Sequence, residues 1–562
     1  MPRRRCRLSV ALALPLALGC FGASLLAQPR RAVNATAAEP ARGVSLSELS
    51  TFSDLERVVY EIMPFGEDFF VATVESEAGG RGSLGTSATL DDLYALRLYR
   101  YDADLRRDDA LEVPWPDEAR EHISLTTVGE RFVWTYARHG REDGTVALGV
   151  DVLDGAGALV AEEEIMTLRA RDYRRDRLDF RAAFTPSRSH YVRVYVEQSE
   201  NRVFSKRDDE EAAATILVVD DGGAIVSNRR VGLGANRDQL TVEAVSVDSE
   251  GRAYVLARVL DNERGRERRR GGSDAGLRLY TLEPGGGAVA RTDLELQGQY
   301  IEGVGMVPND VGAPAIVGLY SERVGRAIAG YFSGADVRDG ATLRPRPFTR
   351  DLLEAMGRKV TRGRGDGLAI ENQFEFRDAL RLADGRLALL MESFDVRVYT
   401  PPPTVGGGFQ ATRVSYVYGE GVIFDFAADG TLRDAIVVPK LQVTEQPGLP
   451  YARMNLVEYE GHAAVVYNDN PKNFARATSK RTKGLNWNKS LAVLGYAETT
   501  SRRRDGERLR RVPLFARRDA DKVIAIPPSV TRLPDGRVVF LATRYRTFGR
   551  NQLRFGVLSE AM

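Results

Sequence analysis

The stretch "DGRLALLMES" at residues 384–393 decides the fold of this chain. Asp384 and Gly385 are residues that favour a tight turn, and an apolar run of strand-forming length follows them. The stretch therefore predicts the turn and the second strand of a β-hairpin. One hairpin defines no architecture, but this pattern recurs along the whole chain.

Seven further stretches repeat the turn and the apolar run, and successive copies are separated by about 60 to 76 residues. They are "GEDFFVATV" (66–74), "GERFVWTYA" (129–137), "SRSHYVRVYV" (187–196), "EGRAYVLARV" (250–259), "GAPAIVGLYS" (312–321), "EGHAAVVYND" (460–469) and "DGRVVFLATR" (535–544). Between the copies, runs such as "ILVVDDGGAIV" (216–226) predict two more strands joined by a Gly-containing turn. Each unit is thus expected to hold four strands, with a long loop between the second and the third.

Repeated four-stranded units predict an all-β fold, a β-propeller. Eight blades are expected, with seven as the alternative, because the copies at 187–196 and 312–321 match the pattern loosely. The last copy supplies only three strands, so the stretch "GVSLSELSTF" (43–52) is expected to add the fourth strand and close the ring. One short helix is expected at 349–359.

The first 27 residues have the composition of an export signal, with a basic start, an apolar core and a small residue at the expected cleavage point. Cleavage after Ala27 would leave a linker at 28–43 and a single propeller domain at 44–562. It would also remove Cys6 and Cys20, the two cysteines of the chain, and with them any disulfide or thiolate metal site. The expected location is periplasmic or secreted, with a lipid anchor at Cys20 as the alternative.

The overall charge balance gives no support for nucleic acid as a partner. The precursor has a net charge of +1, and loss of four signal arginines leaves 75 basic against 78 acidic residues, a net charge of −3. This balance gives no indication of nucleic acid as a partner. No stretch outside the first 27 residues is long and apolar enough to cross a membrane, so we expect a soluble protein after cleavage, and we expect it to be a monomer. The basic runs at 264–270 and 501–511 leave an anionic glycan or a membrane surface open as a partner.

Long connections are expected on one face of the ring, where the second strand of a unit passes to the third. They are residues 75–92, 197–213, 261–276, 394–413 and 467–490. Loops of this length are usually functional or disordered. Several on one face predict a binding surface around the central channel.

The last third of the chain resembles a family of secreted bacterial propeller-like proteins that has no assigned role. The stretches that carry this resemblance are "FEFRDALRLADGRLALLMES" (374–393), "FDFAADGTL" (424–432), "YNDNPKN" (467–473) and "RLPDGRVVFLATRYRTFGR" (532–550). The motif "YNDNPKN" is the most specific of them. The resemblance implies the fold and export, and it implies no catalytic residues.

The motif also holds the polar residues that we consider first for ligand binding, namely Asn468, Asp469, Asn470 and Asn473. Asn and Asp side chains commonly cap turns by accepting hydrogen bonds from nearby backbone amides. Their amides and oxygens also match the hydroxyls of a sugar or the amides of a peptide. Ca²⁺ is a third hypothesis, although one formal negative charge is little for that ion. No other cofactor is expected.

Glu392, Arg544 and Tyr545 complete the candidate ligand site, because they lie at the same ends of neighbouring second strands. No catalytic residue is assigned, since no ordered nucleophile, base and orienting group is recognisable. The four histidines show no metal-site spacing, and His190 and His462 occupy the first position after a hairpin turn.

These patterns favour an exported β-propeller that acts as a binding or scaffold module for an extracytoplasmic glycan or protein. A carbohydrate-active or other hydrolytic enzyme that uses carboxylates of the long-loop face is the alternative. One fold hosts many functions, so the fold alone does not decide between them.

Overall fold

The structure of the protein is a computed structural model. It describes residues 44–46, 56–76, 93–113, 120–140, 144–169, 179–196, 211–237, 239–260, 275–322, 328–334, 343–350, 353, 361–362, 368–369, 374–399, 412–444, 451–474, 482–485, 491–497, 509–514, 523–544 and 552–558. The chain divides at residue 38 into two units, 1–38 and 39–562, and all described residues belong to the second. The expected export signal therefore lies outside the described residues. No described helix is long and apolar enough to cross a membrane.

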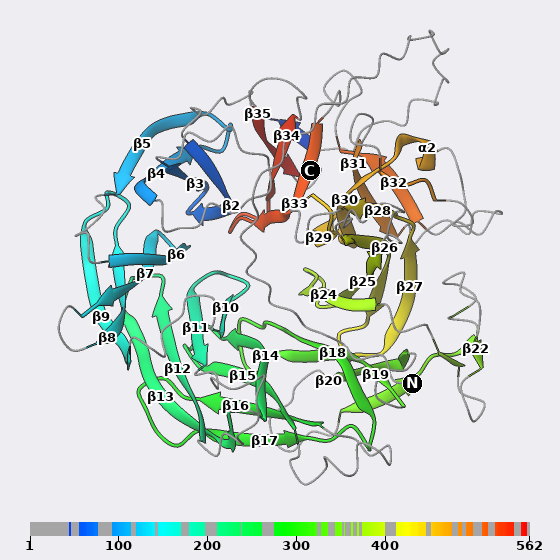
Figure 1. The fold of residues 1–562 in the computed structure, drawn as a ribbon, viewed down its shortest axis with the longest axis horizontal. Coiled ribbons are helices and arrows are strands. Elements are labelled where there is room, and N and C mark those ends of the chain that lie inside the picture. Colours follow the sequence, from blue (N-terminus) through cyan, green and yellow to red (C-terminus); the bar gives the residue numbers. More distant parts are fainter. Residues whose placement is uncertain are drawn as a thin grey trace, which may run out of the picture. The chain divides into compact units, whose positions relative to one another are not determined.

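Eight four-stranded antiparallel sheets form the blades of a β-propeller, as predicted (Figure 1). Blades 1 to 4 consist of β2 (Glu56–Phe65), β3 (Asp68–Ser76), β4 (Leu93–Tyr101) and β5 (Arg107–Val113); β6 (Arg120–Val128), β7 (Arg131–His139), β8 (Thr145–Leu153) and β9 (Leu159–Arg169); β10 (Asp179–Phe184), β11 (His190–Val196), β12 (Glu211–Asp220) and β13 (Ile225–Asn236); and β14 (Leu240–Val247), β15 (Ala253–Leu260), β16 (Ala275–Leu282) and β17 (Ala290–Leu294). Blades 5 to 8 consist of β18 (Tyr300–Val307), β19 (Ala315–Ser321), β20 (Ile328–Gly334) and β21 (Arg344–Pro347); β24 (Phe374–Arg381), β25 (Leu387–Tyr399), β26 (Arg413–Phe426) and β27 (Leu432–Val438); β29 (Asn455–Tyr459), β30 (His462–Asp469), β31 (Leu491–Ala497) and β32 (Leu509–Pro513); and β33 (Val523–Arg532), β34 (Val538–Arg544), β35 (Gln552–Leu558) and β1 (Val44–Leu46).

The hairpin turns that define the blades have the local structure that their residues favour. In the turn of blade 6, Gly385 has φ +85°, a left-handed conformation in which a side chain would be strained. Leu382 N donates to Arg386 O at 2.8 Å and closes this turn. All eight predicted copies place such a connection between the first and second strands of a blade.

The ring closes through pairing of its two ends, as predicted from residues 43–52. Strand β1 pairs antiparallel with β35, with Val44 opposite Leu558 and Leu46 opposite Gly556. An aromatic group reinforces the seam between the last and first blades, because the ring of Phe555 lies 5.3 Å from Phe69 and 4.3 Å from Tyr101. Closure removes the open edge that blade 8 would otherwise present.

The first strand of each blade lies nearest the centre of the ring (Figure 1). The first strands of neighbouring blades contact one another, for example β14 and β18, or β2 and β33. Between the blades, aliphatic side chains form the core; one cluster joins Val192 and Val218 of blade 3 to Val245 and Val255 of blade 4. Such face-to-face packing of twisted sheets buries both faces of each blade.

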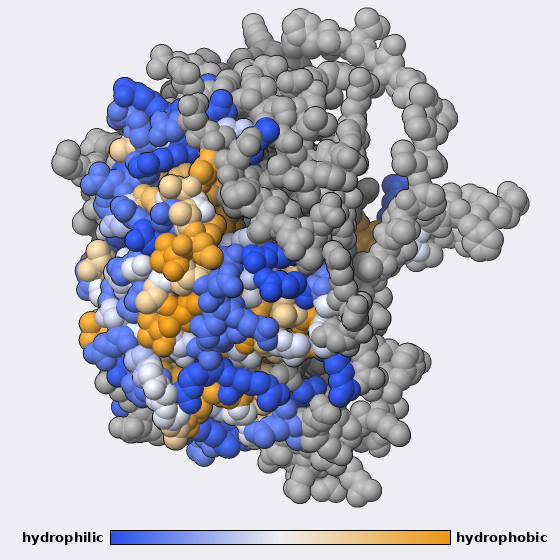
Figure 2. Space-filling model, turned by 90° about the vertical axis from the view of Figure 1, so that its left-hand side faces the viewer, coloured by the Kyte–Doolittle hydropathy of each residue, from blue (hydrophilic) through white to orange (hydrophobic). Residues whose placement is uncertain are grey.

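The outer strands show a mixed surface. Figure 2 shows the side of the molecule on which the outer strands of the first blades lie, with hydrophobic patches separated by hydrophilic residues. Leu159 and Val160, at the start of β9, are 55% and 47% exposed. Single exposed aliphatic residues of this kind are normal on a globular protein.

Two local predictions need comment. The expected loop at 394–413 is wrong at its start, because β25 continues to Tyr399, whereas β26 begins at Arg413, the last residue of the expected loop. The alternation of "FDVRVY" suits a strand better than a loop, and β28 (Gln442–Thr444) pairs with the same extension. Of the expected helix at 349–359, Leu353 N donates to Thr349 O at 3.1 Å, and most of the remainder lies outside the described residues. Two further short segments are β22 (Thr361–Arg362), which pairs with β23 (Leu368–Ala369), and helix α2 (Pro471–Phe474).

Candidate functional site

The two faces of the ring differ in their connections. We call the face with the connections between second and third strands, and between successive blades, the long-loop face. The opposite, short-turn face carries the hairpin turns. The candidate residues Asn468, Asp469 and Arg544 lie at the long-loop ends of β30 and β34, as expected. Tyr545 lies outside the described residues.

Asn468 joins two blades rather than facing outward. It is 0% exposed, its Nδ2 donates to Ala525 O at 2.8 Å, and its Oδ1 accepts from Ala525 N at 2.8 Å. Ala525 belongs to β33 of the next blade. A third hydrogen bond runs from Asn468 Nδ2 to Tyr451 O at 3.0 Å. The side chain thus acts like a strand residue that pairs across the seam between blades 7 and 8.

Asp469, Asn470 and Asn473 organise the turn that follows β30. Asp469 Oδ1 accepts from Asn470 N and from Asn473 Nδ2, each at 2.7 Å. Asn473 also pairs twice with the backbone of Lys483, and Asn470 Nδ2 donates to Gly484 O at 2.8 Å. These hydrogen bonds confirm the turn-capping interpretation of the motif. A direct ligand contact by these four residues stays a prediction, and their burial does not favour it.

The Asp469 carboxyl is buried and only one of its two oxygens is hydrogen-bonded among the described residues. Its Oδ2 is buried and has no hydrogen-bond partner among the described residues. Burial raises the pKa of Asp469 to about 6, while hydrogen bonds from Asn473 and Asn470 oppose that shift. With a pKa of about 6, this carboxyl changes its protonation state between weakly acidic and neutral pH.

Glu392 belongs to a buried charge cluster in blade 6. It is 0% exposed, its Oε1 forms an ion pair with Lys440 Nζ, and its Oε2 accepts from Arg377 Nε at 2.9 Å. Burial lowers the pKa of Lys440, and Glu392 opposes that shift. Lys440 Nζ also donates to Ala452 O at 2.6 Å. Both carboxylate oxygens of Glu392 are thus occupied by protein cations.

The histidines show no metal centre. His190 and His462 are the first residues of β11 and β30, as predicted. His139 Nε2 lies 3.0 Å from Glu121 Oε2, and Trp134 Nε1 donates to His122 Nδ1 at 3.0 Å. No group of three or more His, Cys, Asp and Glu residues that could hold a metal occurs within the part of the chain that the structure describes.

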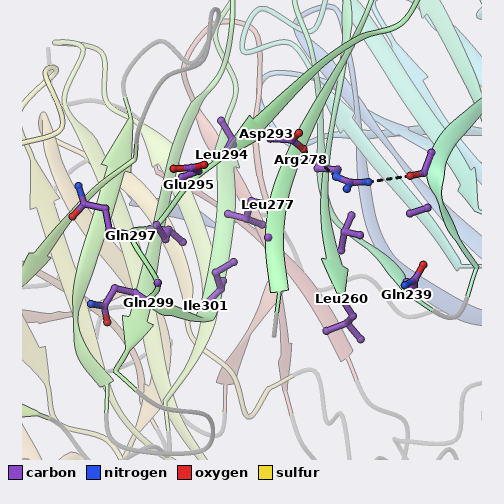
Figure 3. Close-up of a pocket in the computed structure, with 16 residues that line it drawn as sticks. Gln239, Leu260, Leu277, Arg278, Asp293, Leu294, Glu295, Gln297, Gln299 and Ile301 are labelled. Carbon is purple, nitrogen blue, oxygen red and sulfur yellow. Dashed lines mark hydrogen bonds and ion pairs between the residues drawn. The ribbon is translucent and has the colours of Figure 1, made fainter. Parts of the chain in front are cut away.

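A cavity of about 450 Å³ opens at the long-loop end of blade 4 (Figure 3). Its walls come from the end of β13, the residue before β14, the end of β15, the start of β16, and the link from β17 to β18. The lining residues are Gly234, Ala235, Gln239, Val259, Leu260, Gly276, Leu277, Arg278, Asp293, Leu294, Glu295, Leu296, Gln297, Gly298, Gln299 and Ile301. None of its polar side chains belongs to the long loops or the motifs from which the candidate site was predicted, because they lie on strands and on the links between blades. The repeated amides of "QGQ" at 297–299 are the one signal that could have drawn attention to it.

The polar groups of the cavity include three glutamine side chains. In the view of Figure 3, Gln239 lies on one side and Gln297 and Gln299 on the other, with the amide ends of Gln297 and Gln299 directed away from Gln239. Gln299 Oε1 is buried and has no hydrogen-bond partner among the described residues. Gln239 Oε1 accepts from Asn236 N at 3.1 Å.

An ion pair borders the cavity on its outer side. Arg278 Nε lies 3.0 Å from Asp293 Oδ1, and Arg278 Nη1 donates to Gly234 O at 3.1 Å. Although burial opposes the shift, Arg291 and Arg278 hold the pKa of Asp293 below its usual range. The charge of Arg278 is therefore balanced within the protein.

The described turns of the short-turn face are joined from blade to blade. Most of these links end on a backbone carbonyl oxygen, which fixes one turn against the next. They run from Arg131 Nε to Gly222 O (3.3 Å), from Ser187 N to Asp310 Oδ1 (2.9 Å), from Ser249 Oγ to Asp310 O (2.6 Å), from Ser333 Oγ to Gly430 O (2.7 Å), from Arg386 Nη2 to Gly461 O (2.5 Å) and from Arg537 Nη2 to Glu67 O (2.7 Å). The short-turn face is thus a cross-linked base for the long-loop face.

Comparison with known proteins adds little beyond the fold. No family model matches the chain, and no curated protein matches its sequence. Among solved structures, the polysaccharide lyase Uly1 is similar over 92% of this chain and 100% of its own, at 11% identity and a TM-score of 0.33. The β-propeller domain of the Trilobed protease from Pyrococcus furiosus is similar over 68% of this chain and 96% of its own, at 11% identity and a TM-score of 0.30. A variant of the Synechocystis apocarotenoid oxygenase covers 72% of this chain and 97% of its own, at 11% identity and a TM-score of 0.28. At TM-scores this low, the similarities carry no argument about function.

Proposed function

We propose that this protein is an exported binding or scaffold module whose long-loop face takes up an extracytoplasmic glycan or protein. The observation that carries this proposal is the cavity on the long-loop face, which a cross-linked short-turn face supports. Turns of the short-turn face are hydrogen-bonded from blade to blade, whereas the long-loop face holds a cavity of about 450 Å³. Pockets of this size on a rigid support are typical of ligand sites.

The hydrolytic alternative requires carboxylates that a substrate can reach. Glu392 and Asp469 are 0% and 1% exposed. The third acid considered for that role, Asp395, is partly exposed and forms an ion pair with Arg397 at 3.1 Å. Glu392 is also occupied by Arg377 and Lys440. No observation therefore favours the enzyme over the binding module.

An array of glycans, peptidoglycan fragments and peptides tests the proposal. The protein is applied in low salt and again in high salt, and retention is measured for each ligand. We expect retention of a limited set of ligands. Loss of that retention in high salt would assign binding to the basic runs at 264–270 and 501–511. No retention in either condition would contradict the proposed function.

Export is a separate part of the proposal, because it depends on residues 1–27. N-terminal sequencing of protein collected from the periplasm or the medium measures it directly. The proposal expects a mature chain that begins at Gln28. Full-length protein retained in the cytoplasm would contradict it.

A further inference from the structure

We infer that the blade 4 cavity binds a neutral, hydroxyl-rich sugar residue of a glycan chain. This inference rests on the proposed binding function and adds to it the site and the ligand class. The cavity of about 450 Å³ is large enough for a sugar residue together with part of its neighbour. Because the cavity lies at the long-loop end of blade 4, the rest of the glycan could extend across the long-loop face.

The polar groups of the cavity match hydroxyl groups. A carboxamide offers a donor and an acceptor side by side, which is the arrangement that two adjacent sugar hydroxyls complement. Gln239, Gln297 and Gln299 supply three such groups from opposite sides of the cavity (Figure 3). Gln299 Oε1 is buried and has no hydrogen-bond partner among the described residues, so this side chain would gain a partner by turning toward a ligand hydroxyl.

The link between blades 4 and 5 holds two of these amides in place. Gln297 and Gly298 have φ values of +51° and +81°, and Gln299 N donates to Leu296 O at 3.0 Å. A tight turn of this type fixes the backbone positions of Gln297 and Gln299 relative to each other. A site that is ordered before binding loses less entropy when the ligand arrives.

The apolar residues of the cavity do not favour a lipid or an aliphatic peptide side chain. Leu277, Leu294 and Leu296 are 1%, 3% and 6% exposed, so they offer little apolar surface to a ligand. The exposed parts of these leucine side chains are large enough only to contact the C–H groups of a sugar ring. The surface that a ligand meets is therefore mainly amide and backbone.

The charges of the lining favour a neutral sugar over an acidic one. Three ionisable side chains line the cavity, Arg278, Asp293 and Glu295. Asp293 is paired with both Arg278 and Arg291, and Glu295 is exposed at the rim. These two cations and two anions sum to zero, and both cations are already paired with Asp293, so they offer little attraction to a uronate carboxylate.

Titration calorimetry on the full chain tests the inference with neutral gluco-oligosaccharides, N-acetylglucosamine oligomers and an oligogalacturonate. The variants are Gln299→Leu, which removes the buried acceptor, and Gly276→Val, which fills the cavity. A Cβ at Gly276 meets no atom within 4 Å, so the second variant is expected to fold even if the first does not. Asn309→Leu, an amide-to-leucine change on the short-turn face, is the control.

We expect a neutral oligosaccharide to bind, with about tenfold weaker affinity in each cavity variant and no change in the control. High salt should leave this binding unchanged. Neutral binding that both cavity variants retain would overturn the assignment of the cavity, while the binding function would stand. Binding of the oligogalacturonate or of peptides alone would overturn the ligand class. Absence of any ligand from the wider array would overturn the proposed function itself.

Discussion

Asn468 of blade 7 and Ala525 of blade 8 share two hydrogen bonds, each 2.8 Å long. One amide side chain thereby satisfies both the N–H and the C=O of a residue in the next blade. Because the pair is buried, its removal leaves two backbone groups without partners. The most specific motif of the chain thus maintains a seam of the ring.

Replacement of Asn468 by Ala should lower the free energy of unfolding by about 3 kcal/mol, since it removes three hydrogen bonds and leaves buried polar groups unpaired. Chemical denaturation measures the change. Asn309→Ala is the control, because its single hydrogen bond to Val311 O lies at the surface, and about 1 kcal/mol or less is expected there. Equal effects of the two substitutions would contradict the structural role of Asn468.

Asp469 should make stability depend on pH. Its folded pKa of about 6 lies above the ordinary value of 3.8, so the folded state binds the proton more tightly than the unfolded state. Stability should therefore fall as pH rises from about 4 to about 6 and then level off. The total loss from this group is about 2–3 kcal/mol.

Asp469→Asn isolates this contribution, because the amide does not titrate and other carboxyls are common to both proteins. We expect the variant to gain stability over the parent as pH rises from 4 to 7, measured as the difference between denaturation curves at each pH. A difference that stays constant, or that decreases over this interval, would show that the carboxyl is not held at a raised pKa.

A disulfide between residues 45 and 557 should form and stabilise the ring. Ser45 lies directly opposite Val557 in the β1–β35 pair, within the reach of a disulfide. In a chain with Cys6→Ser and Cys20→Ser, the pair Ser45→Cys and Val557→Cys should add about 2–4 kcal/mol. The control pair Ser45→Cys and Val539→Cys spans one further strand and should stay reduced. Failure of the first pair to oxidise would argue against closure by β1.

Arg537 should fasten the closing blade on the short-turn face. Its guanidinium donates to Glu67 O at 2.7 Å and to Ala103 O at 3.1 Å, both in blade 1. Arg537→Ala should lower stability by about 1–2 kcal/mol. Arg252 has the same position in blade 4, but its carboxylate partners, Asp248, Glu250 and Glu283, belong to its own blade. Arg252→Ala should therefore leave hydrogen exchange in blade 1 unchanged, whereas Arg537→Ala should accelerate it.

Most of the fold could be predicted because its determinants are local. A turn residue such as Gly385 and the alternation after it specify a hairpin without reference to distant residues. Closure could be predicted as well, because a three-stranded last unit requires a fourth strand from elsewhere. The start of the loop at 394–413 was mispredicted, because its Pro- and Gly-rich centre obscured the strand pattern of residues 394–399.

The candidate site could not be predicted in the same way. Whether the oxygens of Asn468 face solvent or Ala525 depends on how two blades pack. The cavity depends on Gln239, Gly276 and Gln299, which are far apart in the sequence and meet only when blade 4 has formed. A short sequence motif cannot indicate contacts between residues that are so far apart in the sequence.

Hydrogen exchange with and without a saturating ligand from the array tests the central claim most directly. The account predicts slower exchange at residues 276–278 and 293–301, at the long-loop end of blade 4, and unchanged exchange in the hairpin turns at 382–386 and 533–537. Protection of those turns, with none around the cavity, would contradict it.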